Sequence, residues 1–74
     1  MIRTMSPEPF WNRPCAASGL TSYRYGNGPY GFVMIGAKDD QDALQEARRS
    51  VSGHIYPNRL ERWNGTAYAA VWPA

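Results

Sequence analysis

Few arrangements of side chains in this 74-residue sequence could catalyse a reaction. His54 is the only histidine and Cys15 is the only cysteine. A nucleophilic mechanism needs a base beside the nucleophile, and no serine or cysteine motif accompanies His54. The only nearby cation that could activate Cys15 is Arg13. We therefore interpret both as incidental side chains and expect that this protein is not an enzyme.

Two segments have some features of ligand sites. Asp39, Asp40 and Asp42 form a carboxylate cluster, but the glycine and the distal glutamate of a calcium loop are missing. Residues 26–31 are rich in glycine, but a phosphate loop leads into a helix and this segment leads into an apolar one. We interpret the acids as helix caps and the glycines as a turn, and we predict no metal ion and no cofactor.

Aromatic side chains are the best candidates for binding. Tryptophan, tyrosine and arginine dominate the energetics of protein interfaces. The residues expected to bind a partner are Trp63, Tyr68, Trp72, Tyr23 and Tyr25. The expected partner is another protein or a second copy of this chain.

Binding of single-stranded nucleic acid is the alternative, because sheet faces with spaced aromatics and flanking arginines stack bases. The arginines concerned are Arg24, Arg59 and Arg62. The net charge of +2 permits such binding without requiring it. However, alternation along a strand directs Arg24 away from Tyr23 and Tyr25, and Arg62 away from Trp63. Arginines and aromatics are therefore expected on largely different faces.

The first elements that must position these side chains are two strands. Leu20–Tyr25 and Phe32–Ala37 are rich in β-favouring residues and are separated by turn formers. The second segment is apolar at successive positions, which predicts a strand covered on both faces and central in the sheet. Within it, Gly36 indicates a bulge or a close approach of the following helix.

Residues 39–51 predict a helix. Asp39 or Asp40 can cap its first turn, and basic residues lie near its other end. Leu44, Ala47 and Val51 recur at i, i+3 and i+7, which makes a narrow apolar stripe. We expect this stripe to pack on one face of the sheet.

Asn64 and Gly65 predict a two-residue type I′ turn between strands at Arg59–Trp63 and Thr66–Trp72. This turn would pair Trp63 with Thr66 and would give the hairpin two faces. One face carries Leu60, Arg62, Ala67, Ala69 and Val71, and we expect it to meet the helix. The other carries Glu61, Trp63, Thr66, Tyr68, Ala70 and Trp72, and a single helix cannot cover both faces. We expect Tyr23 and Tyr25 to join this aromatic face.

The predicted fold is α+β in the order β-β-α-β-β, with one helix on one face of a four-stranded, largely antiparallel sheet. Residues 1–19 hold three of the six prolines and show no apolar period, which predicts an irregular or disordered arm before a single small domain at 20–74. A core of that size rarely supplies more than about 3–5 kcal/mol. Docking of Phe10 and Trp11 onto the domain, or a core shared by two chains, would add stability.

Several features predict a cytoplasmic location. No apolar stretch approaches the roughly 20 residues of a membrane helix. The first residues contain no apolar run of signal-peptide length. A single cysteine cannot form an intramolecular disulfide.

Parts of residues 20–72 resemble short uncharacterised proteins encoded by bacteriophages, prophages and related mobile elements. The similar segments are 23–25, 31–37, 42–50 and 60–68. The resemblance implies a bacterial host cell, an accessory gene, and a role in binding or modulating a host or phage component. It implies no particular catalytic or binding residues.

Overall fold

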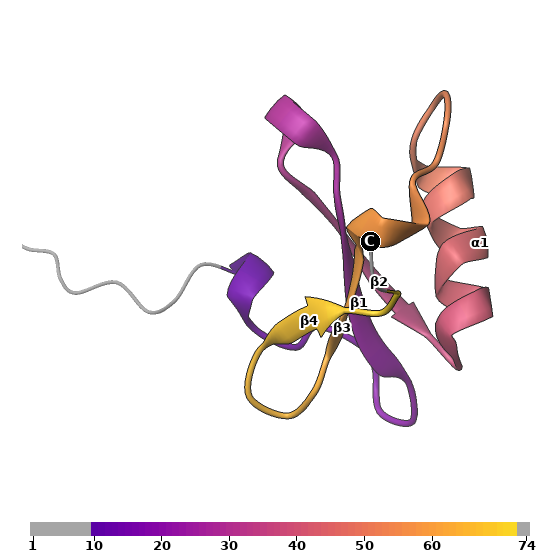
Figure 1. Cartoon of the computed structure of the whole chain (residues 1–74). Helices are drawn as coiled ribbons and strands as arrows, with labels where there is room; N and C mark the ends of the chain where they lie inside the picture. The colour runs from indigo at the N-terminus through magenta and orange to yellow at the C-terminus, as the bar shows by residue number, and fades with distance from the viewer. Residues whose placement is uncertain (1–9, 73–74) are drawn as a thin grey trace, which may run out of the picture.

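The computed structural model describes residues 10–72, which form a four-stranded sheet with one α-helix on one side (Figure 1). The strands are β1 (Thr21–Gly26), β2 (Phe32–Ala37), β3 (Leu60–Trp63) and β4 (Tyr68–Ala70), and the helix is α1 (Asp40–Ser50). Three short 3-10 turns accompany them: η1 (Phe10–Asn12), η2 (Gly28–Tyr30) and η3 (Pro57–Arg59). The predicted α+β fold is confirmed. No helix in this range has the length and apolarity needed to cross a membrane.

All strand pairs are antiparallel, and the sheet order is β2-β1-β3-β4. The expectation that Phe32–Ala37 is a central strand is therefore wrong, because β2 lies at an edge. Both faces of β2 nevertheless have neighbours, which accounts for apolar residues at successive positions. Ile35 belongs to the core that α1 covers, and a Cβ at Gly36 would come 3.2 Å from the Cβ of Ala16 on the other face. The close approach at Gly36 comes from the N-terminal segment and not from the helix.

Helix α1 forms where the sequence predicts it. The carboxylate of Asp39 accepts a hydrogen bond of 2.8 Å from the backbone N–H of Asp42, which satisfies a free donor of the first turn. Ala43, Leu44 and Ala47 are buried against the sheet. Within the described residues, no group of histidine, cysteine and acidic side chains could hold a metal ion.

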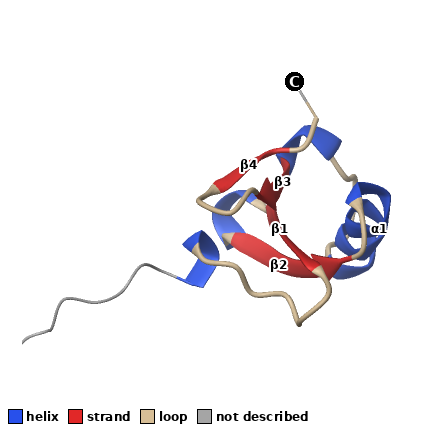
Figure 2. Cartoon of the chain, turned by 90° about the horizontal axis from the view of Figure 1, so that it is seen from below, coloured by secondary structure: helices blue, strands red, loops and turns tan. Residues whose placement is uncertain are grey.

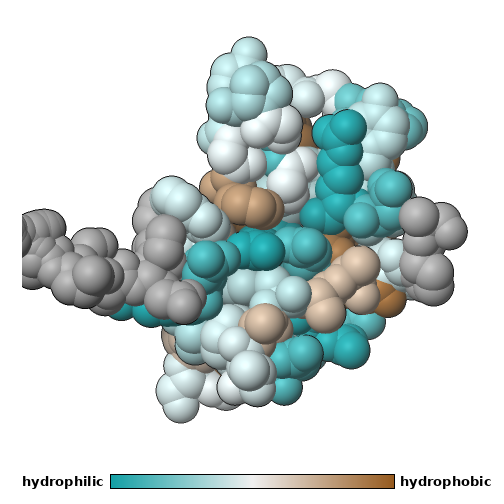
Figure 3. All heavy atoms as spheres, turned by 60° about the vertical axis from the view of Figure 1, so that its left-hand side comes forward, coloured by the Kyte–Doolittle hydropathy of each residue, from teal (hydrophilic) through white to brown (hydrophobic). Residues whose placement is uncertain are grey.

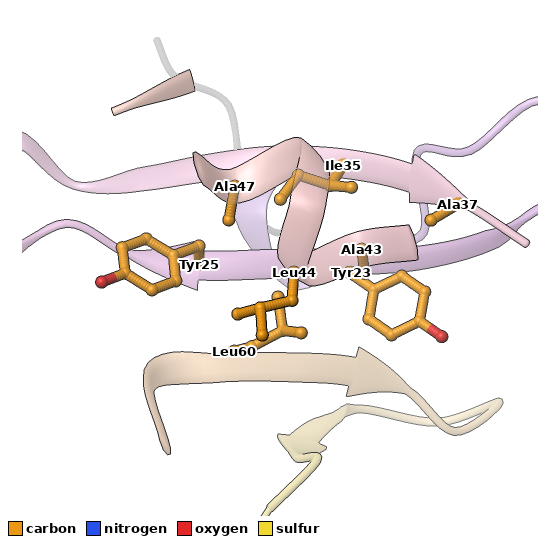
Figure 4. Close-up of a cluster of buried hydrophobic side chains, with 8 residues drawn as sticks. All are labelled: Tyr23, Tyr25, Ile35, Ala37, Ala43, Leu44, Ala47 and Leu60. Atoms are coloured by element: carbon orange, nitrogen blue, oxygen red, sulfur yellow. The ribbon is translucent and has the colours of Figure 1, made fainter. Parts of the chain in front are cut away.

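The core between α1 and the sheet is small and depends on tyrosine rings (Figure 4). Tyr23 and Tyr25 of β1 are 1% and 2% exposed and lie on either side of Leu44 and Leu60. Their rings point to opposite ends of the core, so that each hydroxyl reaches its rim. There Tyr23 donates a 2.6 Å hydrogen bond to Asp40, and the hydroxyl of Tyr25 accepts one of 3.0 Å from the Tyr56 N–H. The apolar parts of both rings are thus buried while their polar atoms keep partners.

The hairpin between β3 and β4 forms, but the predicted two-residue turn is wrong. Trp63 pairs with Tyr68, so four residues, 64–67, make the loop. A type I′ turn requires positive φ at Asn64, and φ there is not positive. The Asn64 side chain instead accepts hydrogen bonds from the N–H groups of Thr66 and Ala67, as in an Asx turn. The register differs from the predicted one by two residues, so each paired side chain keeps its predicted face.

Candidate functional site

The face of the sheet opposite α1 carries the candidate site, and we call it the open face. It comprises Ser22 and Arg24 of β1, Phe32, Met34 and Gly36 of β2, Glu61 and Trp63 of β3, and Tyr68 and Ala70 of β4. Alternation along the strands places these side chains opposite to the tyrosines of the core. The predicted position of Trp63 and Tyr68 on the face that the helix does not cover is confirmed.

Arg24 is the central polar side chain of the open face. Its Nε donates to Glu61 Oε1 at 2.5 Å, and the side chain of Arg24 is only 15% exposed. Its guanidinium lies over the rings of Phe32 and Tyr68, 4.3 and 4.7 Å from their centroids. Such a planar cation suits both stacking and several directed hydrogen bonds at once. Arg24, itself on β1, thereby contacts side chains of all three other strands of the sheet.

Residues 11–20 lie across the open face, on the side of the sheet away from α1 (Figures 1 and 2); we call them the docked segment. Side chains of the sheet hold its main chain. Arg24 Nη1 donates to the carbonyl of Trp11 at 2.7 Å, and the Tyr68 hydroxyl donates to that of Arg13 at 2.8 Å. Ser22 Oγ accepts from the N–H groups of residues 15 and 16 at 2.9 and 2.8 Å. The segment is irregular, as predicted, but it packs against the sheet.

Two side chains of the docked segment, those of Trp11 and Asn12, also contact the sheet. The Trp11 ring stacks on Phe32 at 6.5 Å between centroids, and Asn12 accepts a 2.8 Å hydrogen bond from Arg24. Docking of Trp11, one of the two expected sources of extra stability, therefore occurs within a single chain. The side chain of Phe10 and all of residues 1–9 lie outside the described residues.

The docked segment leaves part of the open face accessible. Trp63 and Tyr68 meet edge to face at 5.2 Å, and both are half-buried. A shallow groove of about 290 Å³ is bounded by Asn12, Arg24, Tyr68 and the loop at 66–67. On the side of the molecule shown in Figure 3, hydrophobic atoms form separate patches among hydrophilic ones. The visible surface is thus a mixed polar and apolar one and not a continuous aromatic sheet.

The predicted place of Tyr23 and Tyr25 on the aromatic face is wrong. Both belong to the core beneath α1, because the helix presents mainly alanines there and the large tyrosine rings fill the remaining volume. Burial, followed by the hydrogen bond to Asp40 and its charge, raises the pKa of Tyr23 from 10.0 to about 12, against an opposing effect of Arg62. Burial and then Cys15 raise the pKa of Tyr68 to about 12 as well.

The raised pKa of Tyr23 predicts a loss of stability in alkali. Above pH 10 the unfolded chain releases this phenolic proton while the folded chain holds it to about pH 12. The protonated Tyr23 hydroxyl therefore makes its full contribution to the free energy of unfolding below pH 10, and this contribution is lost as pH rises to 12. A difference of two pKa units corresponds to about 3 kcal/mol. Urea unfolding of wild type and Tyr23→Phe at pH 8 to 11.5 tests this, because Tyr23→Phe should show a shallower pH dependence. Parallel curves for the two proteins would contradict it.

Trp72 also departs from its predicted face. Strand β4 ends at Ala70 and the chain bends at 71–72, so the alternation that would place Trp72 beside Trp63 no longer applies. Trp72 packs against the core instead. With Tyr23, Asp40 and Arg62 it lines a shallow groove of about 530 Å³ beside the start of α1.

The three arginines proposed to contact nucleic acid do not share a surface. Arg24 is held within the open face. Arg62 is on the helix side, where its Nη1 lies 3.0 Å from Asp40 Oδ1. Arg59 is in η3, with its guanidinium 4.5 Å from the centroid of the Tyr56 ring. The predicted directions are confirmed, because Arg24 lies opposite to Tyr23 and Tyr25 and Arg62 lies opposite to Trp63. Arg24 nevertheless shares its face with Tyr68, so the separation of arginines from aromatics is incomplete.

Three further residues contact Arg24 or the docked segment and were not among the predicted site residues: Ser22, Phe32 and Glu61. One signal for them was present. In residues 22–25, serine and arginine alternate with two tyrosines. If both tyrosines are buried on one face of the strand, serine and arginine must lie on the opposite face and make it polar. The other candidates remain peripheral: Cys15 is exposed in the docked segment, and His54 contacts Tyr56 in the loop after α1.

Comparison with known proteins identifies no relative of this chain. The chain matches no protein-family model, and neither the curated proteins nor the solved structures contain a significant match to it. The resemblance to phage and prophage proteins accordingly stays a prediction.

Proposed function

We propose that this protein is a non-enzymatic protein-interaction module that binds an extended polypeptide segment on its open face. Trp63 and Tyr68, with Arg24 beside them, are the binding residues, and the contacts of the docked segment support this mode of recognition. In line with the resemblance, we place the module in the cytoplasm of a bacterial host as an accessory protein of a phage or mobile element.

One observation carries this proposal: the open face holds a polypeptide mainly through its main chain. Arg24 and Tyr68 donate to two backbone carbonyls, and Ser22 accepts from two successive backbone N–H groups. Contacts of this kind do not depend on the side chains of the bound segment, and any extended peptide offers the same groups. A face built in this way suits a polypeptide ligand better than a base or a small metabolite.

Anisotropy of a fluorescent peptide tests the proposal. The peptide copies residues 10–17 with Cys15→Ser. It is titrated with the full-length protein carrying Trp11→Ala and Asn12→Ala, a background that weakens the protein's own docked segment and in which each variant below is compared. We expect saturable, salt-insensitive binding, because the contacts are hydrogen bonds and ring stacking. Tyr68→Phe should weaken it roughly 2–10-fold through loss of one hydrogen bond, and Trp63→Ala should weaken it by removing the ring that supports Tyr68.

The matched control is Tyr30→Phe, which removes the same hydroxyl from a ring that is 85% exposed in η2. It should bind the peptide like wild type. Absence of saturable binding, or equal effects of Tyr68→Phe and Tyr30→Phe, would refute the assignment of this surface. Affinity for a fluorescent oligonucleotide that falls steeply with salt would support the nucleic-acid alternative instead.

A further inference from the structure

We propose that the partner of the open face is a second copy of this chain, and that two copies exchange residues 11–16 to form a dimer. This inference rests on the proposed function, since it names the polypeptide that the open face binds. Each copy would place its residues 11–16 on the other's sheet. The exchange is reciprocal, so the assembly closes with two-fold symmetry and leaves no open face unfilled.

The contacts of the docked segment allow this exchange. Within residues 10–72, hydrogen bonds to the side chains of Ser22, Arg24 and Tyr68 anchor residues 11–16 to the sheet. The apolar contacts are also with the sheet, at Phe32 and Gly36. Residues 11–16 of a second copy could make the same contacts, because none of them requires both groups to belong to one chain.

The connection between the docked segment and β1 is the hinge. Residues 17–20 form a tight turn with one backbone hydrogen bond, from the Leu20 N–H to the Ala17 carbonyl at 3.0 Å. All four residues are exposed, so none of them has to leave a buried position when the turn opens. Gly19 has φ of +89°, a conformation that other residues rarely adopt. The balance between the closed and exchanged forms therefore depends mainly on this turn.

The length of the hinge limits the geometry of the dimer. Fully extended, its four residues span at most about 14 Å. The two sheets must therefore lie close together, with their open faces next to the point where each chain crosses. Such an arrangement would also bury more of Trp63 and the groove beside Tyr68 than one chain covers alone.

The first test changes the hinge. A Cβ at Gly19 meets no atom within 4 Å, so Gly19→Val acts through the backbone conformation alone. Valine disfavours positive φ and should open the turn in both copies, which lowers the dimer dissociation constant by more than about tenfold. Gly53→Val is the matched control, because Gly53 has φ of +87° and equal free space but lies outside the hinge. Light scattering over a concentration series should show more dimer for Gly19→Val only.

The second test shows which chain supplies the segment. Ala16→Cys with Gly36→Cys, in a Cys15→Ser background, puts two thiols at positions whose Cβ atoms are close enough for a disulfide. Oxidation at high protein concentration should give covalent dimers on a non-reducing gel. Cys15→Ser with Ala16→Cys alone controls for random cross-linking and should give fewer.

Each result decides the inference. Concentration-dependent dimers with the intermolecular disulfide would support it. The inference would be overturned if the disulfide formed only within single chains, whether these chains were monomers or parts of dimers, and if the same held for Gly19→Val. If the peptide of residues 10–17 still bound in that case, the proposed function would stand with another protein as the partner. If neither peptide binding nor dimers appeared, both proposals would fail.

Discussion

Leu60→Ala is expected to leave most of the protein unfolded at room temperature. Leu60 is fully buried, pairs with Tyr25 across β1 and β3, and lies next to Leu44 at the centre of the core (Figure 4). Removing a buried leucine side chain costs about 2–5 kcal/mol, because transfer energy is lost and a cavity remains. A core of this size supplies only about 3–5 kcal/mol. The loss is thus comparable with the whole stability.

Circular dichroism and urea unfolding measure this effect, with Leu20→Ala as the matched control. Leu20 is 41% exposed, so the same substitution there removes much less buried surface and should cost far less. A Leu60→Ala protein with the urea midpoint of Leu20→Ala would show that the core beneath α1 does not hold the fold together.

Local patterns predict much of this fold because they reflect local physics. The acids at 39–42 and the apolar stripe of residues 43–51 specify α1, since capping and a 3.6-residue period depend only on neighbours in sequence. The faces of β3 also follow from the sequence. They survive the wrong turn at Asn64, because an error of two residues in register preserves the face of each paired side chain.

The alternation along β1 specifies two faces, but it does not specify which one meets the helix. Tyr23 and Tyr25 look like surface aromatics when only their type is considered. Their place in the core depends on Ala43 and Ala47, whose small side chains leave a space that the rings fill. The burial of the tyrosines thus depends on how α1 and β1 pack together, and it cannot be predicted from the sequence of either element alone.

The docking of residues 11–20 has no periodic signal at all. Its hydrogen bonds use the main chain of the segment, which every sequence carries, and side chains such as Ser22 and Tyr68 that are far away in sequence. An irregular, proline-containing segment therefore cannot be distinguished from a disordered arm by composition. The glycine at position 36 was the one local indication of a close neighbour, and it did not identify Ala16.

Arg24→Ala is expected to release the docked segment and to destabilise the sheet. The substitution removes the hydrogen bonds to Trp11 and Asn12 and leaves Glu61, which is 30% exposed, without its ion-pair partner. Hydrogen bonds to charged groups contribute about 1.5–3 kcal/mol. The urea midpoint should therefore fall, and chymotrypsin should cut after Trp11 faster than in wild type.

Two further variants separate the causes. Arg24→Lys keeps the charge but lacks the planar fork that bonds Glu61, Trp11 and Asn12 together, so it should restore stability only in part and protection after Trp11 hardly at all. Arg49→Ala removes an exposed arginine that pairs with Glu46 on α1 and should match wild type in both measurements. If Arg24→Ala behaved like Arg49→Ala, the guanidinium would not be what fixes residues 11–16 to the open face. The exchange of that segment between copies would then need another anchor.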